Sequence, residues 1–183
     1  MSSSPSERST LTLFRRFDHR VLAANRGLMI LILAVMSVIV LANVATRYLS
    51  NYSIPWSEEL ARYLMIWLTF VGIGPVLRAG GHVAIDSLHD SLGPRPARWL
   101  RLFIVALLGL FCAVVAWFGS AYVGRTWHQS TAVMEIPFAF VAAAVPTGMV
   151  MALWHLAAMA GDYIAEARFQ VSADLGEAEA AAI

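Results

Sequence analysis

Residues 53–67, SIPWSEELARYLMIW, place three charged side chains at the start of a hydrophobic run. Glu58, Glu59 and Arg62 fall within one helical turn and a half, and no further charged residue follows until Arg78. The uncharged stretch between the two arginines covers about 22 Å as a helix, which is less than the roughly 30 Å of a bilayer's hydrocarbon core. Arg62 is therefore expected at the membrane interface or slightly below it. The two carboxylates lie three and four residues earlier, within reach of Arg62 on a helix.

The composition also indicates a membrane protein. The chain is 59% hydrophobic and 14% charged, whereas soluble domains average about 45–50% apolar and about 25% charged residues. Three further uncharged runs cover 27–46, 102–124 and 136–161, and a helix needs roughly 20 apolar residues to cross a bilayer. The sequence therefore predicts an all-α integral membrane protein with four transmembrane helices, at about residues 27–47, 60–78, 100–123 and 137–160.

Basic residues precede the first hydrophobic run, as they do in a cleaved signal peptide. The run 27–46 is longer than the roughly 7–15 apolar residues of a signal peptide, and three more spans follow it. We therefore expect this segment to be a retained span. Cys112 is the only cysteine, so neither an intrachain disulfide nor a thiolate metal site is expected.

The distribution of arginine predicts the topology. Ten of the 13 basic residues lie before the first span, around the connection between the second and third spans, or after the fourth. The positive-inside rule then places both termini in the cytoplasm. We divide the chain into a cytoplasmic N-terminal segment (1–26), a transmembrane domain (27–161) and an acidic tail (162–183), whose composition predicts disorder.

The N-terminal segment is amphipathic over residues 11–26. At helical spacing one face carries Leu13, Phe14, Phe17 and Val21, and the other carries Arg15, Arg16, His19 and Arg20. We favour an interfacial helix on the anionic inner leaflet. The alternative is an Arg-rich flank that directs topology and has no fixed structure.

The second span has two distinct faces. One face carries Trp56, Glu59, Tyr63, Trp67, Phe70 and Gly74, and the other carries Glu58, Arg62, Thr69, Gly72 and Val76. Two faces of different chemistry suggest two neighbours: the chain's own bundle or lipid on one side, and a partner protein or Arg47 on the other. The alternative for the aromatic residues is an interfacial belt. We expect Ser57 to be the N-cap of this helix, and Glu58 or Glu59 to pair with Arg62 or Arg47.

The third and fourth spans carry signals of close helix packing. Small residues recur at intervals of three and four in the third span: Ala106, Gly109, Ala113, Ala116 and Ser120. Such a stripe lets a second helix approach closely. Pro75 and Pro146 lie inside spans and are expected to bend them, since each removes a backbone donor.

These segments resemble a known family of transport proteins. The stretches are RYLSNYSIPWSEELARYLMIWLTFVGIG (47–74), LRAGGHVAIDSL (77–88) and IPFAFVAAAVPTGM (136–149). They are similar to the small membrane subunit of tripartite ATP-independent periplasmic (TRAP) transporters over about residues 25–160, least in the third span. The matching positions are Arg47, Tyr48, Pro55, Trp56, Ser57, Glu58, Glu59, Arg62, His82, Asp86, Pro137, Pro146 and Gly148. Pro75 departs from the small residue that the family pattern has there.

The resemblance implies a division of labour between subunits. A periplasmic solute-binding protein would deliver a small organic anion to a large permease subunit driven by a sodium gradient. The present chain would be the accessory scaffold in the bacterial inner membrane, with no catalytic, cofactor or metal residues and no nucleic-acid partner, in contact with membrane lipids. The expected structural and partner-interface motif is Arg47, Tyr48, Trp56, Glu58, Glu59, Arg62, Tyr63, Trp67, His82 and Asp86.

Other classes of protein explain the residues less well. The main alternative is a membrane anchor or assembly subunit of another complex, such as a redox complex. Such a subunit would have no haem of its own, because His155 is the only histidine within a span and a haem held by two histidines needs an opposed pair. A metal site at His82, Asp86, His89 and Asp90 is the second, although solvated loop residues explain this cluster better. No nucleophile stands beside a base in the pattern of an enzyme. A self-sufficient transporter would need charged residues and a buried polar relay deep in the spans, and we expect no charged residue deeper than Arg62.

Overall fold

The computed structural model describes residues 5–78 and 94–166. These residues form five helices: α1 (Pro5–Ser50), α2 (Pro55–Arg78), α4 (Pro94–Thr126), α5 (Ala139–Ala142) and α6 (Ala144–Glu166). The described part of the chain contains no strand, so the predicted all-α class is confirmed.

Four segments are long and apolar enough to cross a membrane: Asp18–Ser50, Pro55–Arg78, Pro96–Thr126 and Ala139–Gly161. The predicted number of spans is therefore confirmed. The first and third extend well beyond the predicted ranges because α1 and α4 continue as helices past their uncharged runs. The last span combines α5 and α6, which are separated only at Ala143.

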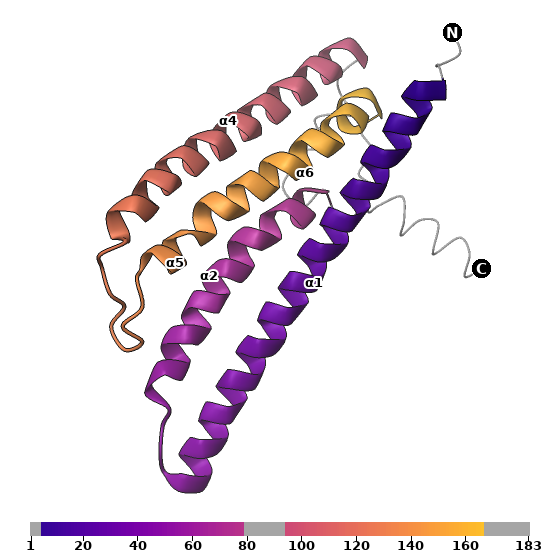
Figure 1. Ribbon diagram of the computed structural model, residues 1–183. Coiled ribbons are helices and arrows are strands. Elements are labelled where there is room, and N and C mark those ends of the chain that lie inside the picture. Colours follow the sequence, from indigo (N-terminus) through magenta and orange to yellow (C-terminus); the bar gives the residue numbers. More distant parts are fainter. Residues whose placement is uncertain (1–4, 79–93, 167–183) are drawn as a thin grey trace, which may run out of the picture.

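The predicted interfacial helix is not a separate element, because residues 11–26 are part of the continuous helix α1 (Figure 1). The side chains of the first 17 residues lie outside the described ones. An amphipathic segment on the membrane surface therefore stays a prediction.

The helices lie side by side in the order α1, α2, α6, α4 (Figure 1). α1 packs on α2, α6 packs between α2 and α4, and short α5 precedes α6 next to α4. Along the helix axes, the beginning of α1 and the end of α6 lie at the same end of the bundle, which we call the terminal end. The α1–α2 and α4–α5 connections lie at the opposite end, which we call the loop end.

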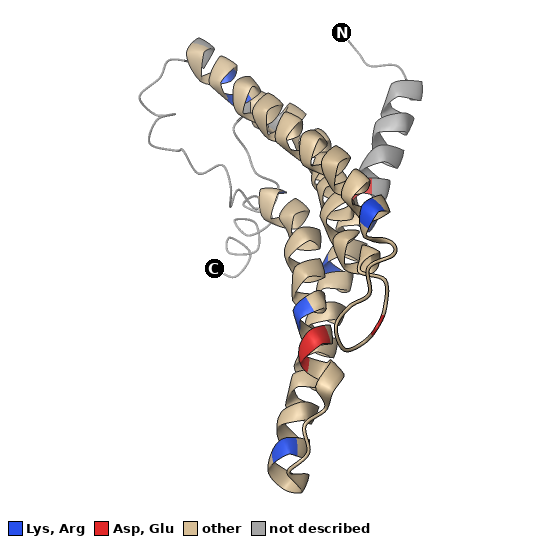
Figure 2. Cartoon of the chain, turned by 90° about the vertical axis from the view of Figure 1, so that its left-hand side faces the viewer, with Lys and Arg blue, Asp and Glu red and all other residues tan. Residues whose placement is uncertain are grey.

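The buried core lies where α6 meets α2 and α4. Its fully buried members are Leu77, Cys112, Ala116, Met149, Ala152, Met159 and Tyr163. The outer helices α1 and α4 leave long apolar faces uncovered. Charged residues occupy only isolated turns of the described helices (Figure 2).

Glycines set the distance between α2 and its neighbours. A Cβ atom at Gly148 of α6 would lie 2.5 Å from the carbonyl oxygen of Phe70 in α2. A Cβ at Gly72 would lie 3.2 Å from Met29 of α1. Gly148 is needed because the backbones of α2 and α6 approach each other closely there, as is common between helices in membranes. At Gly72 an added methyl group would meet only the flexible end of the Met29 side chain.

Only part of the small-residue stripe of α4 packs against another helix of this chain. Ala116 is buried, and Gly109 lies opposite Leu156 of α6. Ala106 and Ala113 are exposed on the outer side of α4. Within this chain, α6 therefore contacts only part of the stripe.

The two span prolines have different surroundings. α2 continues as a helix through Pro75 to Arg78. Pro146 lies in the first turn of α6, where a missing backbone donor costs little, and the helix is interrupted three residues earlier at Ala143. The break therefore falls between α5 and α6.

The glycine contact predicts an asymmetry between two Gly→Ala substitutions. Gly148→Ala forces α2 and α6 apart and should cost about 1–3 kcal/mol of stability, as overpacking does in cores. Gly124→Ala in α4, where no atom lies within 4 Å of the added methyl, should be neutral or slightly stabilising. Thermal unfolding of both variants in the same detergent checks this. Equal melting temperatures would show that the close approach is not required.

Candidate functional site

We call the first charged residues of α2, Glu58, Glu59 and Arg62, the charged lip. Its central residue is Glu59, whose side chain is buried, with an exposed fraction of 8%. Its Oε1 accepts a hydrogen bond from the backbone N–H of Ala132 (3.0 Å), and its Oε2 accepts from Val133 (2.9 Å) and Met134 (2.8 Å). The hydroxyl of Tyr63 donates to Oε1 at 2.5 Å. We call the three backbone N–H groups the carboxylate cradle. Consecutive backbone donors of this kind form a typical anion-binding nest, and bonds to an ionised acceptor are among the stronger ones.

The α4–α5 connection forms the cradle by closing on itself. The N–H of Thr131 donates to the carbonyl of Ile136 (2.9 Å), and the N–H of Ile136 donates to the Thr131 hydroxyl oxygen (3.2 Å). A bridge pairs Ser130 with Pro137. Glu135 turns the chain with a φ of 55°, in the left-handed region that non-glycine residues rarely adopt. These contacts leave the intervening N–H groups pointing at Glu59.

The predicted ion pair at the lip is wrong. Glu59 binds backbone donors more than 70 residues downstream, which sequence spacing along one helix cannot indicate. Glu58 and Arg62 are exposed, and Arg47 lies 6.0 Å from the centre of the Tyr48 ring. In the described part of the chain, the salt bridge is formed elsewhere, and neither arginine pairs with a carboxylate.

The aromatic face of α2 lies against α5 and α6. The indole Nε1 of Trp67 donates to the carbonyl oxygen of Phe140 at 3.2 Å, and Phe70 contacts Gly148. The chain's own helices are thus one of the two neighbours expected for α2. An interfacial aromatic belt accounts for Trp56, which is 44% exposed, but not for these two deeper residues.

The other face of α2 is largely uncovered. Gly72 packs on α1, but the rest of the face is exposed: Glu58, Arg62, Thr69 and Val76. Tyr48 is 80% exposed at the same loop end. The interface-motif residues His82 and Asp86 lie outside the described residues, as do His89 and Asp90 of the alternative metal site.

Asn43 fixes the α1–α2 connection. Its Oδ1 accepts hydrogen bonds from the N–H of Ile54 (2.8 Å) and the hydroxyl of Ser53 (3.4 Å). Ser57, expected to be an N-cap, instead lies in the first turn of α2, and its hydroxyl donates to the Ile54 carbonyl at 2.7 Å. The sequence analysis missed Asn43. The sign in the sequence that could have indicated it is a side-chain amide within an otherwise apolar transmembrane run.

A buried salt bridge lies at the terminal end. The Arg78 guanidinium donates from both Nη atoms to the two carboxylate oxygens of Asp18, with Nη1 2.6 Å from Oδ2. Trp154 of α6 adds a hydrogen bond to the same carboxylate. Arg78 and Asp18 are 1% and 6% exposed, and a buried bidentate pair of this kind fixes α1 against α2. The sequence analysis missed the pair because it assigned Asp18 to a segment outside the spans.

A second polar contact lies deeper on the same helices. Asn25 Nδ2 lies 3.2 Å from Nε2 of His155, and both residues are almost fully buried. The His155 ring occupies the space where a side chain at Gly74 would stand. Asn25 lies in the segment 1–26, which we placed before the first span, so the sequence did not indicate this contact. With the salt bridge, this contact brings α1, α2 and α6 together.

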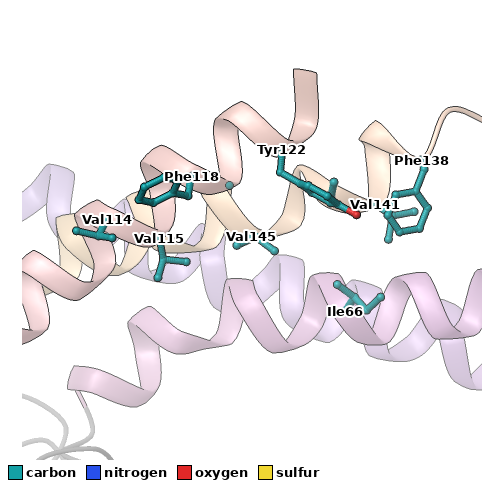
Figure 3. A pocket seen from close by; sticks show the side chains of 10 residues that line it. Ile66, Val114, Val115, Phe118, Tyr122, Phe138, Val141 and Val145 are labelled. Carbon is teal, nitrogen blue, oxygen red and sulfur yellow. The ribbon is translucent and has the colours of Figure 1, made fainter. Parts of the chain in front are cut away.

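An apolar cavity of about 570 Å³ opens between α2, α4 and the α5–α6 segment (Figure 3). Phe118 and Tyr122 of α4 face Val141, Val145 and, across the gap, Ile66 of α2. The remaining lining is Val114, Val115, Gly119, Phe138 and Ala142. A cavity without charged groups suits an apolar chain or side chain better than a hydrophilic solute. Among the described residues, no three His, Cys, Asp or Glu side chains come together as metal ligands.

Comparison with known proteins relates this helix arrangement to one family. The family model for the DctQ component of tripartite ATP-independent periplasmic transporters matches residues 36–164. The chain belongs to this family. The matched region begins within α1 and includes α2, α4, α5 and nearly all of α6, so it contains the cradle and the whole interface motif.

Several relatives are small permease proteins of TRAP transporters. The chain is 36% identical over 108 residues to such a protein of Haemophilus influenzae, covering 59% of this chain and 66% of the relative. It is 29% identical over 102 residues to the C4-dicarboxylate small permease DctQ of Rhodobacter capsulatus (55% and 45%). It is 32% identical over 87 residues to the sialic acid small permease SiaQ of Vibrio cholerae (46% and 50%). The chain thus spans less than two thirds of the length of each of these three relatives.

The buried salt bridge predicts a strong effect of single substitutions. Asp18→Ala or Arg78→Ala leaves one charge buried without its partner and should cost about 3 kcal/mol of stability. The double variant Asp18→Leu/Arg78→Met removes both charges and should recover most of that loss. Arg98→Ala, an exposed arginine at the same end, is the control and should change little. Melting in detergent measures all four. A double variant as unstable as the singles would contradict the pairing.

Proposed function

We propose that this chain is the small, non-translocating subunit of a binding-protein-dependent secondary transporter that imports organic anions. It supports a large permease subunit, which moves the solute with a sodium gradient, and a periplasmic protein supplies that solute. Family membership carries the proposal. Two of the relatives are named for C4-dicarboxylates and sialic acid, which are both organic acids.

The polar groups of the described spans favour a supporting role. Cation and anion sites of secondary transporters need free oxygen ligands and donors near mid-membrane. Here the span hydroxyls donate to carbonyls of their own helix: Ser37, Thr46, Ser50, Thr69, Ser120 and Thr126. Glu59 and Asp18 bind groups of this same chain. The hydrogen bonds of these hydroxyl and carboxylate groups therefore stabilise the fold of the subunit.

Uncovered surface supports assembly with a partner in the membrane. The outer faces of α1 and α4 are apolar along most of their length, and α2 leaves Glu58 and Arg62 exposed at the lip. We propose that the lip, with Arg47, Tyr48 and Trp56, contacts the transporter's other subunits at the loop end. Exposed aromatic residues and arginine are typical of interface hot spots.

Reconstitution tests the supporting role. The purified chain in vesicles with a sodium gradient should show no uptake of C4-dicarboxylate or sialic acid, the two probe solutes. Uptake of the solute carried should appear only when the large subunit and the soluble receptor are added. Uptake by this chain alone, or full uptake by the other two components without it, would overturn the proposal.

We propose further that the protein lies in the bacterial inner membrane with both termini in the cytoplasm and the loop end in the periplasm. The arginine distribution supports this orientation. The Glu59 contacts require both loop-end connections to lie on one side of the membrane, and the arginine distribution favours the periplasm for that side.

Cysteine labelling tests the orientation. In a Cys112→Ala background, Asn51→Cys and Ser130→Cys should react with a membrane-impermeant maleimide in intact spheroplasts. Arg98→Cys, at the terminal end, should react only after the membrane is permeabilised. Labelling of Arg98→Cys from outside would reverse the proposed topology.

A further inference from the structure

The bonds that close the α4–α5 connection do not involve Glu59. They are the Thr131–Ile136 hydrogen bonds and the Ser130–Pro137 bridge, and Glu135 turns the loop in the left-handed region. Thr131 is 5% exposed and also contacts Tyr63 of α2. These bonds can therefore persist when the carboxylate is removed.

We propose that the cradle is a preformed carboxylate-binding site, that Glu59 is its built-in ligand, and that a free small carboxylate binds it when that side chain is shortened. Three convergent backbone donors at 2.8–3.0 Å define the site. The Tyr63 hydroxyl is the fourth donor. Converging N–H groups carry partial positive charge and favour an anion over a neutral acceptor.

Charge gives the site its preference for a carboxylate. The Glu59 oxygens are the acceptors that the structure shows for the N–H groups of Ala132, Val133 and Met134, although Ala132 and Val133 are themselves exposed residues. Hydrogen bonds from converging donors to an ionised acceptor are stronger than those to a neutral one such as water. We therefore expect a carboxylate to compete with water there.

The size of the missing group selects the ligand. Glu59→Ala removes one methylene carbon and the carboxylate and leaves Cβ in place. Acetate, a methyl group with a carboxylate, replaces those atoms one for one. Acetamide has nearly the same shape but no charge, and its NH₂ group would face donors. The site should therefore take acetate and reject acetamide.

The position of the cradle gives the contact a structural role. Glu59 is a residue of α2, whereas the cradle belongs to the segment between Tyr122 of α4 and Phe138 before α5. Tyr122 and Phe138 both line the apolar cavity. The bound carboxylate thus fixes the loop-end mouth of this cavity relative to α2.

Hydrogen exchange of the cradle amides in the purified full chain tests the proposal. In Glu59→Ala, exchange at Ala132, Val133 and Met134 should be at least ten times faster than in the wild type. Acetate should slow it again in a saturable way, and acetamide at equal concentration and ionic strength should not. Glu58→Ala, which changes an exposed carboxylate next to the site, should keep wild-type exchange with or without acetate.

Glu59→Gln separates loss of the ligand from misfolding. Its side chain fills the space, so exchange should be faster than in the wild type yet unaffected by acetate. Fast exchange in Glu59→Ala that acetate leaves unchanged would show that Glu59 shapes the cradle and would overturn the proposal. Wild-type protection in Glu59→Ala without acetate would overturn it too, because the donors would then need no carboxylate.

Discussion

A chain that lies in a bilayer has little water to satisfy its polar groups, so partners inside the protein are strongly favoured for them. The described polar contacts of this protein follow from that constraint. Span hydroxyls donate to carbonyls of their own helix. Asp18 and Arg78 form a salt bridge, Asn25 contacts His155, and Glu59 accepts hydrogen bonds from the carboxylate cradle. Each of these longer contacts joins segments far apart in the sequence and therefore also determines how the helices assemble.

α2 organises this assembly because three different surfaces lie around it. Its aromatic face packs on α5 and α6, where Gly148 permits close approach. A second side rests on α1 through Gly72, and Asn43 and Asp18 tie the two ends of that helix pair. The third side is exposed and carries Arg62. The charged lip thus serves two purposes, since Glu59 binds inward while Glu58 and Arg62 remain on the surface.

The row of helices explains why a small permease subunit of this family would act with a partner. Within the described helices, α2 and α6 each have a neighbour on both sides, whereas the outer helices α1 and α4 present apolar faces that a larger membrane protein or lipid has to cover. The polar contacts at the two ends hold the row together without occupying those faces. The start of α2 leaves charged and aromatic groups exposed at the loop end.

The sequence alone determined the helical class, the number of spans and the family, because long uncharged runs and a local motif are properties of neighbouring residues. It also indicated two faces on α2. Only the tertiary structure decided which groups meet: that Glu59 binds residues 132–134 and not Arg62, and that Asp18 belongs to the bundle. Helical spacing reports which side chains share a face of one helix, whereas these contacts depend on the packing of α1, α2 and α6, which brings distant backbone donors and charges within hydrogen-bond distance.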